Sequence, residues 1–225
     1  MLLTNKVALI TATADETSLQ WDLAKLLADA GAAIVVHDNE GRDELKKRVD
    51  YLHNVNRRAL AIMADLSEQS QREKLLDQVI DKLGRLDILV MAMPEIEDAD
   101  LLTLSSTAVA DMTTKLEATI LLAKTMVRQM LAQGEGGRIL IVGQDARSED
   151  VLSQTVEAFA YRLSLELSPF AVSVHCLASI EEAKATFSQT VSVKDLDKSF
   201  KHFESPAGES GDFTPHFKPK DVQLT

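Results

Sequence analysis

Short apolar runs alternate along the chain with stretches of helical periodicity, and this alternation constrains the fold more than any other feature. Strands are expected at about 6–12, 32–37, 59–64, 86–92, 137–143 and 171–177. Helices are expected between them, at about 17–30, 41–53, 68–83, 109–133 and 150–168. Ser67 is expected to cap the third helix and Gly84 to end it. Most of the runs are continuously apolar, as parallel strands covered on both faces are. The pattern predicts an α/β fold, a doubly wound parallel sheet with helices on both faces.

The two ends of the chain differ in composition. Residues 1–180 carry the alternating pattern and are expected to form one domain. The last 26 residues hold three of the five prolines and four of the seven phenylalanines. Proline favours irregular backbone, whereas disordered tails are poor in aromatic residues. Residues 181–225 are therefore expected to form an irregular extension that docks on a partner subunit, with a flexible tail as the alternative.

The formal net charge of −11 restricts the class of partner. Nucleic acids and anionic membranes attract basic surfaces, so neither is expected to bind this chain. No apolar stretch reaches the roughly 18 residues that a membrane helix needs, and the first residues lack the pattern of a secretory signal. Cys176 lies in an apolar run and is expected to be a buried, unreactive thiol. These features favour the reducing cytoplasm.

The segment between the first two expected strands contains no glycine. It runs over residues 12–20 and includes the acidic Asp15 and Glu16. A carboxylate about 4 Å from a phosphate charge costs roughly 4 kcal/mol at an effective dielectric constant near 20, and a helix dipole returns only about 1–2 kcal/mol. This turn is therefore expected to repel a nucleotide phosphate. The two acids also suit the first turn of a helix, which is the structural alternative.

Five local phrases have the order and spacing seen in the short-chain dehydrogenase/reductase family. They are Lys6–Thr11, Leu27–Ala32, Ala64–Ser67, Gly84–Val90 and Gly137–Val142. Together they make residues 5–180 similar to that family. The resemblance implies a Rossmann-like sheet and NAD(P)-dependent oxidoreductase chemistry. It also implies a glycine-rich turn that holds the pyrophosphate and a Tyr-x-x-x-Lys pair that moves a proton.

The residues that the family uses for chemistry are replaced at the matching positions. The family's Asn-Asn-Ala-Gly phrase is Met91–Pro94 here, and its Pro-Gly phrase is Ser179–Ile180. The family's catalytic asparagine, serine, tyrosine and lysine match Lys115, Gln144, Glu149 and Ser153. We therefore expect no catalytic residue, no cofactor-binding residue and no bound cofactor.

Other side chains are weaker candidates for chemistry. Tyr161 has Leu165 rather than a lysine four residues later, and Tyr51 also lacks a lysine at that spacing. Lys115 is expected near Glu149, either in a structural salt bridge or as an acid–base pair.

Two acidic residues end expected strands. Asp38, after His37, suits either a ribose hydroxyl or a strand-end cap. The resemblance places Asp65 near an adenine, where we interpret it as a relic. No metal is expected, because three histidines show no ligand spacing with cysteine or acidic residues. These are His53, His202 and His216.

The helices expected at 109–133 and 150–168 carry apolar residues on more than one side. The core stripe of the first is expected to hold Met112, Leu116, Ile120, Ala123, Val127 and Met130. A helix that is apolar on two sides is buried on two sides, although a wide core face is the alternative. In the family that the chain resembles, the matching helices join subunits.

These features predict a non-catalytic subunit. Its partner is expected to be a catalytically active paralogue, contacted through residues 109–133 and 150–168, in a complex that acts on a substrate such as a hydroxyacyl-CoA. One alternative is a divergent NAD(P)-dependent oxidoreductase that uses Glu149, Lys115 or Tyr161. The other is a sensor that binds a small ligand in the vacated cleft.

Overall fold

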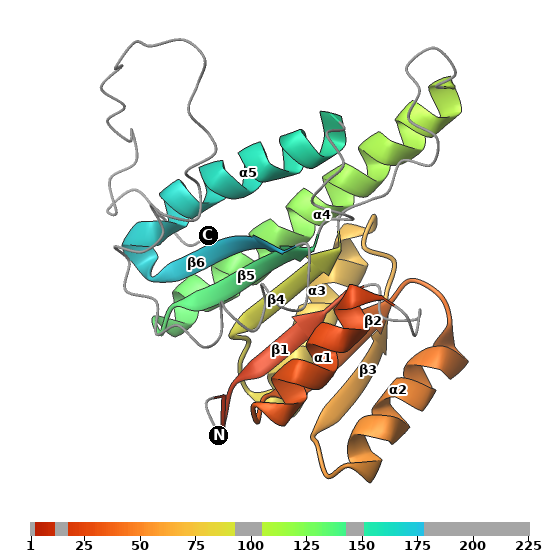
Figure 1. The fold of residues 1–225 in the computed structure, drawn as a ribbon, viewed down its shortest axis with the longest axis vertical. Coiled ribbons are helices and arrows are strands. Elements are labelled where there is room, and N and C mark those ends of the chain that lie inside the picture. Colours follow the sequence, from red (N-terminus) through yellow and green to blue (C-terminus); the bar gives the residue numbers. More distant parts are fainter. Residues whose placement is uncertain (1–2, 12–17, 93–104, 143–150, 178–225) are drawn as a thin grey trace. The chain divides into compact units, whose positions relative to one another are not determined.

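The predicted parallel sheet is present in the computed structural model, which describes residues 3–11, 18–92, 105–142 and 151–177. Six parallel strands lie in the order β3-β2-β1-β4-β5-β6 (Figure 1). The strands are β1 (Val7–Ile10), β2 (Ala33–Asp38), β3 (Ala59–Met63), β4 (Ile88–Ala92), β5 (Gly137–Val142) and β6 (Val172–Leu177). The fold-class prediction is confirmed.

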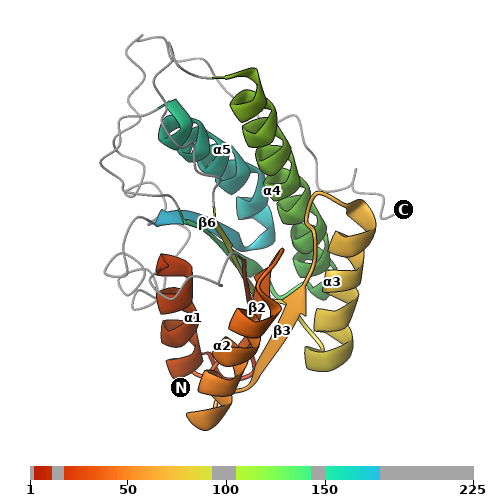
Figure 2. The same cartoon turned by 90° about the vertical axis from the view of Figure 1, so that its right-hand side faces the viewer.

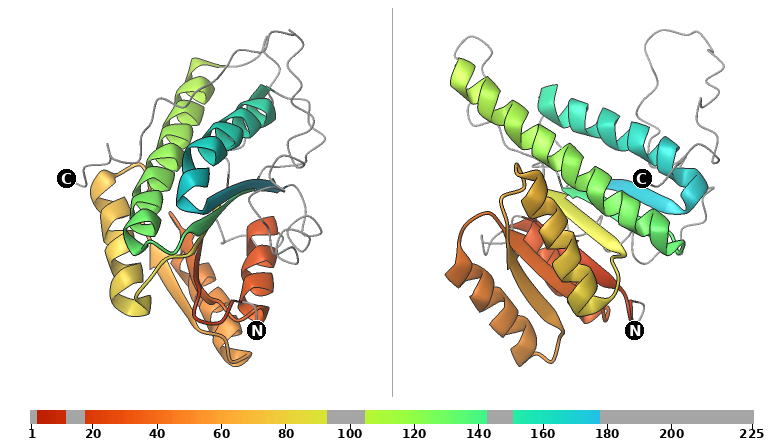
Figure 3. Two further views of the ribbon diagram at one scale, coloured as in Figure 1. Left: turned by 90° about the vertical axis from the view of Figure 1, so that its left-hand side faces the viewer. Right: turned by 180° about the vertical axis from the view of Figure 1, so that it is seen from behind.

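Helices cover both faces of this sheet. They are α1 (Leu19–Asp29), α2 (Arg42–Asn54), α3 (Gln69–Leu83), α4 (Ser106–Gln133) and α5 (Val151–Leu167). Figure 2 and Figure 3 show α1 and α2 on one face and α3, α4 and α5 on the other. A short 3₁₀ helix, Ser168–Phe170, joins α5 to β6. Among the described residues, no helix is long and apolar enough to cross a membrane.

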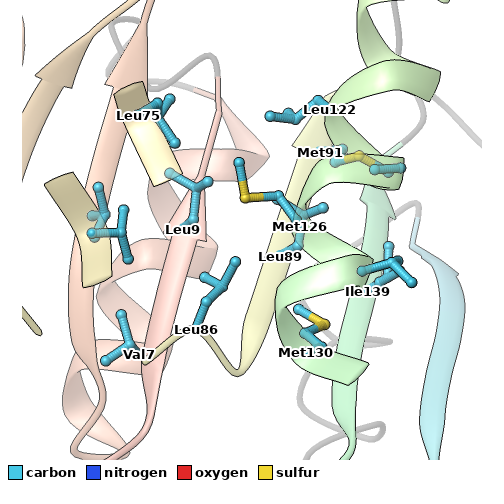
Figure 4. Close-up of a cluster of buried hydrophobic side chains, with 14 of the residues drawn as sticks. Val7, Leu9, Leu75, Leu86, Leu89, Met91, Leu122, Met126, Met130 and Ile139 are labelled. Carbon is cyan, nitrogen blue, oxygen red and sulfur yellow. The ribbon is translucent and has the colours of Figure 1, made fainter. Parts of the chain in front are cut away.

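The larger apolar core lies between the sheet and helices α3 and α4. Side chains of Val7, Leu9, Leu89 and Met91 from the strands meet Leu75 of α3 and three α4 residues (Figure 4). The α4 residues are Leu122, Met126 and Met130. The opposite face has a second core, built on Trp21, Leu23 and Leu27 of α1. Truncating one such leucine to alanine typically costs about 2–5 kcal/mol, so these two layers supply much of the stability.

The predicted core stripe of α4 is wrong at Ile120, which is 38% exposed. Leu122 and Met126, which the predicted stripe leaves out, are buried with Ala123. At about 100° per residue the buried side chains centre the core face between Ala123 and Met126, and Ile120 lies roughly a quarter of a turn away. The predicted helix was therefore correct, and so were the stripe residues Ala123, Val127 and Met130, but the centre of the core face was misplaced toward Ile120.

Two predictions for the ends of α3 had opposite outcomes. Gly84 ends the helix in the left-handed region at φ +81°, as expected. Ser67 does not cap it, because the N-cap residue is Glu68 and the Ser67 hydroxyl donates to Asp65 instead. The serine is thus used by the preceding turn, one residue before the N-cap.

A buried carboxylate joins the amino ends of β1 and β4. Asp87 accepts hydrogen bonds from the Val7 backbone N–H (2.9 Å), the Arg85 Nε atom (2.7 Å) and the Lys6 ammonium (2.9 Å). Glu135, before β5, also accepts from Arg85. Burial alone would raise the pKa of Asp87, but the hydrogen bonds from Arg85, Lys6 and Val7 outweigh it and lower that pKa.

A glutamine closes the same amino-terminal edge. Gln133, the last residue of α4, accepts from the Leu86 N–H at 2.9 Å and donates to the Leu86 carbonyl at 2.8 Å. Both polar groups of one backbone residue are thereby satisfied by one side chain.

The tail lies outside the described residues, and so does its predicted docking. Contacts divide the chain into Met1–Thr190 and Val191–Thr225. The division predicted at residue 180 is therefore left as an expectation.

Candidate functional site

The carboxyl ends of the six parallel strands form one edge of the sheet, and the strand order reverses there between β1 and β4. Ligands of open α/β sheets bind at such a point. Thr11, after β1, joins the two strands: its hydroxyl donates to the Val90 carbonyl at 3.4 Å and accepts from the Ala92 N–H at 3.1 Å. The Thr11 side chain is buried, so the two strand ends are held together at this point.

Helix α1 begins beside this edge. Ser18 is its N-cap, and the Ser18 hydroxyl accepts from the Trp21 N–H at 3.2 Å. The remaining first-turn N–H groups of a helix are the ones that bind phosphates in many nucleotide sites. The turn before Ser18, with Asp15 and Glu16, lies outside the described residues, so the predicted repulsion of phosphate is untested.

The aromatic ring of Trp21 packs between α1 and α2 close to that helix start. The Arg48 guanidinium lies 4.9 Å from the ring centroid, and Tyr51 meets it edge-on at 5.8 Å. Trp21 is the single tryptophan of the chain. It is therefore an internal fluorescent reporter three residues from the N-cap.

The carboxylate of Asp38 caps the end of β2. It accepts from the backbone N–H of Asn39 at 2.8 Å and more weakly from that of Glu40 at 3.4 Å. The predicted strand-end cap is confirmed. The alternative role, a hydrogen bond to a ribose hydroxyl, uses the same carboxylate and stays a prediction.

The carboxylate of Asp65 lies just beyond the end of β3, the strand next to β2. Its Oδ1 atom accepts from the Ser67 N–H at 2.9 Å and the Ser67 hydroxyl at 2.7 Å. These hydrogen bonds lower the pKa of Asp65, so its exposed carboxyl group is ionised at neutral pH. Arg72 donates to the carbonyl oxygens of Leu66 and Ser67 and holds the turn.

The peptide group between Ala64 and Asp65 is held from both sides, which the sequence did not indicate. The Nε2 atom of His37 lies 2.9 Å from the Ala64 carbonyl oxygen, and Gln71 of α3 accepts from the Asp65 N–H at 2.8 Å. Because a carbonyl only accepts, Nε2 carries a proton. Burial lowers the pKa of His37, which keeps the imidazole neutral at pH 7.

Few of the positions matched to the family's catalytic residues are described. Lys115 lies exposed on α4. Tyr161 is 40% exposed on α5, next to the buried Ala160. Gln144 and Glu149 lie outside the described residues, and for Ser153 only the backbone is described. Of these side chains only Lys115 and Tyr161 are therefore described, and the predicted pairing of Lys115 with Glu149 lies outside the described residues.

No metal site was predicted. In the described ranges, no three histidine, cysteine or acidic side chains lie together as metal ligands would. His53 lies 3.2 Å from the Ala59 carbonyl oxygen, and Cys176 is only half-buried rather than fully buried as predicted. Burial, together with the charge of Arg138, lowers the pKa of His175 on β6 to about 4.

The described part of the edge offers groups of the kind that contact the adenosine end of a nucleotide. It offers the start of a helix for a phosphate and two carboxylates at the ends of neighbouring strands, Asp38 and Asp65. Carboxylates accept hydrogen bonds from ribose hydroxyls and from amino groups.

Comparisons with known proteins agree with this architecture. The 2-dehydro-3-deoxy-D-gluconate 5-dehydrogenase of Dickeya dadantii (strain 3937) is 32% identical over 139 residues, 61% of this chain and 53% of that protein. Subunit BbsD of the (2S)-[(R)-hydroxy(phenyl)methyl]succinyl-CoA dehydrogenase of Thauera aromatica is 28% identical over 183 residues, 77% of this chain and 72% of the subunit. The match thus spans about half the length of the first relative.

The solved structures give the same fold. A short-chain type dehydrogenase/reductase from Mycobacterium marinum superposes with a TM-score of 0.71 at 24% identity, covering 78% of this chain and 72% of the other. At that identity the likeness shows the fold alone.

The names of the relatives and the family profile bear on activity and family membership. These relatives are named as dehydrogenases, so the comparisons lean toward an enzyme and lend no support to the predicted loss of activity. The profile described as short chain dehydrogenase matches residues 6–179, more than three quarters of the sequence. The chain belongs to the short-chain dehydrogenase family.

Proposed function

We propose that this chain is a divergent NAD(P)-dependent oxidoreductase that binds its nucleotide along the carboxyl edge of the sheet. One observation carries the proposal: the capped start of α1 and the carboxylates of Asp38 and Asp65 all lie at that edge. The names of the relatives support the same reaction class, since they are dehydrogenases. Asp38 would accept from a ribose hydroxyl, and the α1 amides would face the diphosphate.

We propose that Lys115 or Glu149 transfers the proton in this reaction. Lys115 is exposed on α4, on the same side of the sheet as α5. Tyr161 is the weaker candidate, because Leu165 stands four residues later, where the proton-transfer pair needs a lysine.

A second candidate function is the predicted non-catalytic subunit, and one observation favours it. No glycine stands between residues 1 and 30, and the positions of the catalytic tyrosine and lysine hold Glu149 and Ser153. Backbone approach to a diphosphate normally needs glycine. In this form the chain would resemble the inactive subunit of the benzylsuccinate-pathway hydroxyacyl-CoA dehydrogenase and would pair with a catalytically active paralogue.

The outer face of α5 supports an assembly of either kind. Tyr161 and Leu165 are 40% and 48% exposed on it, one helical turn apart. Arg162 and Glu166 pair across the same face at 3.0 Å. Exposed apolar residues beside paired charges are a common composition for a contact between subunits.

Calorimetric titration of the purified chain with NADH and NADPH separates the two candidates. An enzyme is expected to bind one of them with a dissociation constant in the micromolar range, about −8 kcal/mol. Asp38→Ala should then weaken binding about tenfold, whereas Val55→Ala, an exposed change at the C-cap of α2, should not. A chain that ignores both nucleotides at millimolar concentration refutes the enzyme proposal. Co-purification with an intact family member through α4 and α5 would then support the subunit.

The α5 contact has its own test, by mixing charge variants. Arg162→Glu and Glu166→Arg each place like charges on the face and should weaken self-association or paralogue binding. If the face joins two copies of this chain, an equimolar mixture of the two variants should associate again, because an acidic face then meets a basic one. A mixture that stays monomeric would exclude self-association through α5.

A further inference from the structure

The peptide group that precedes Asp65 has both of its polar atoms bonded to side chains from other elements. His37 of β2 donates to the carbonyl oxygen, and Gln71 of α3 accepts from the N–H. The carbonyl of Ala64 and the N–H of Asp65 belong to one planar unit. Hydrogen bonds to the two opposite edges of that plane fix its rotation.

The hydrogen bond between His37 and the Ala64 carbonyl is buried. His37 is 1% exposed and Ala64 is 6% exposed, so water cannot replace the imidazole if it is removed. Gln71 is half-buried at the start of α3. We call His37 and Gln71 the peptide clamp.

The clamp sets the direction of a neighbouring carboxylate. Asp65 leaves the clamped plane directly, and its Oδ1 atom is occupied by the two Ser67 donors. The remaining carboxylate oxygen is exposed at the edge where Asp38 also lies. Rotating the Ala64–Asp65 plane would turn that oxygen away from any ligand held there.

We propose that His37 and Gln71 are positioning residues that aim Asp65 at the exocyclic amino group of the adenine of a bound nucleotide. This inference rests on the proposed function, since it requires nucleotide binding at the carboxyl edge. The clamp residues touch no ligand. They act through the peptide plane, and Asp65 makes the contact, accepting one N–H bond from the adenine amine.

The test compares two ligands that differ at that amine. Nicotinamide hypoxanthine dinucleotide, reduced, carries a carbonyl where NADH carries the amino group. The wild-type chain should bind NADH about tenfold more tightly than this analogue, because an ionised acceptor facing a carbonyl is left unsatisfied. Binding is followed by quenching of Trp21 fluorescence and checked by calorimetry.

Removing either clamp residue should abolish the preference for NADH over the hypoxanthine analogue, rather than weaken the binding of both dinucleotides equally. His37→Leu removes the donor and Gln71→Met removes the acceptor, each with little change in size. In each variant the preference for NADH should fall below about threefold. His37→Gln keeps an N–H donor at the end of a side chain of similar reach and should restore most of the preference. If His37→Leu does not fold, Gln71→Met carries the test.

Gln133→Met is the matched control. Gln133 also bonds both polar groups of one backbone residue, but at the amino edge of the sheet. It should lower stability while the preference for NADH stays at its wild-type value. This control distinguishes a specific effect on the orientation of Asp65 from a general loss of stability.

The outcomes distinguish this inference from the proposed function. A wild-type chain that binds neither dinucleotide overturns both. A wild-type chain that binds both equally, or a His37→Leu variant that keeps the full preference, overturns the role of the clamp and leaves nucleotide binding in place.

Discussion

The two edges of the sheet use polar side chains in opposite ways. At the amino edge, Lys6, Arg85, Asp87 and Glu135 pair with one another, and Gln133 closes the backbone beside them. At the carboxyl edge, His37 and Gln71 bond the backbone instead, and the carboxylates of Asp38 and Asp65 accept from the backbone of the turns that carry them.

This difference separates stability from binding. A carboxylate that is buried and pairs with cations contributes to folding and presents no bonding capacity to a ligand. A carboxylate at an exposed turn contributes little to folding and can still accept hydrogen bonds. Changes at the amino edge should therefore alter unfolding, and changes at the carboxyl edge should alter affinity.

The largest effect is expected from Asp87→Asn. The substitution leaves two cationic side chains and one backbone N–H around a neutral amide, and breaking such a buried network costs about 3 kcal/mol. Urea unfolding at pH 7 measures the loss. Glu135→Gln is the control: Glu135 is exposed and should shift the urea midpoint far less. An Asp87→Asn chain as stable as the wild type would break the contrast between the edges.

The next effect is a pH dependence that comes from histidines. Burial lowers the pKa values of His37 and His175 from 6.5, that of His175 to about 4. Below pH 6.5 the unfolded chain therefore binds more protons than the folded chain, so stability falls as the pH drops from 6.5 toward 4. Asp87, with a pKa below 3.8, contributes only under more acidic conditions.

Urea midpoints between pH 7.5 and 4.5 measure this slope. His175→Asn should flatten much of it, because burial and the charge of Arg138 lower the pKa of His175 to about 4. If the slope survives both His175→Asn and His37→Gln, buried histidines are not its source.

The fold was predictable because burial is periodic along the chain. Six apolar runs and five amphipathic stretches gave strand and helix bounds within a few residues of those observed. The rotation of α4 was not predictable at Ile120, since apolar residues occupy too much of that helix to single out one face.

The hydrogen-bond partners of the buried polar residues could not be predicted from the sequence for another reason. His37 reaches Ala64 and Asp87 reaches Val7 only because β2 pairs with β3 and β1 with β4 in a fixed register. Such a register joins residues 27 and 80 positions apart, which spacing along one sequence does not reveal. Asp38 was the exception, because a strand-end cap bonds its own next residues.

A smaller effect on stability is expected at Gly84, between α3 and the Asp87 network. Gly84 has φ +81° and nothing within 4 Å of the place where a Cβ would stand. Gly84→Ala should therefore cost only the conformational strain, about 1 kcal/mol. A loss of unfolding free energy of this size in urea, with unchanged NADH affinity, would show that a backbone change at the amino edge also affects stability and not binding.

The smallest effect on stability, and the most informative for function, is expected from Asp38→Asn. The amide oxygen still accepts from Asn39, so the cap survives and unfolding should change by less than about 0.5 kcal/mol. The charge that would hold a ribose hydroxyl is lost, so NADH affinity should fall about tenfold. Thermal unfolding and calorimetry on the same sample read both quantities. Equal affinity with equal stability would mean that Asp38 is only a strand-end cap and that the ribose hydroxyl of a bound nucleotide has another partner.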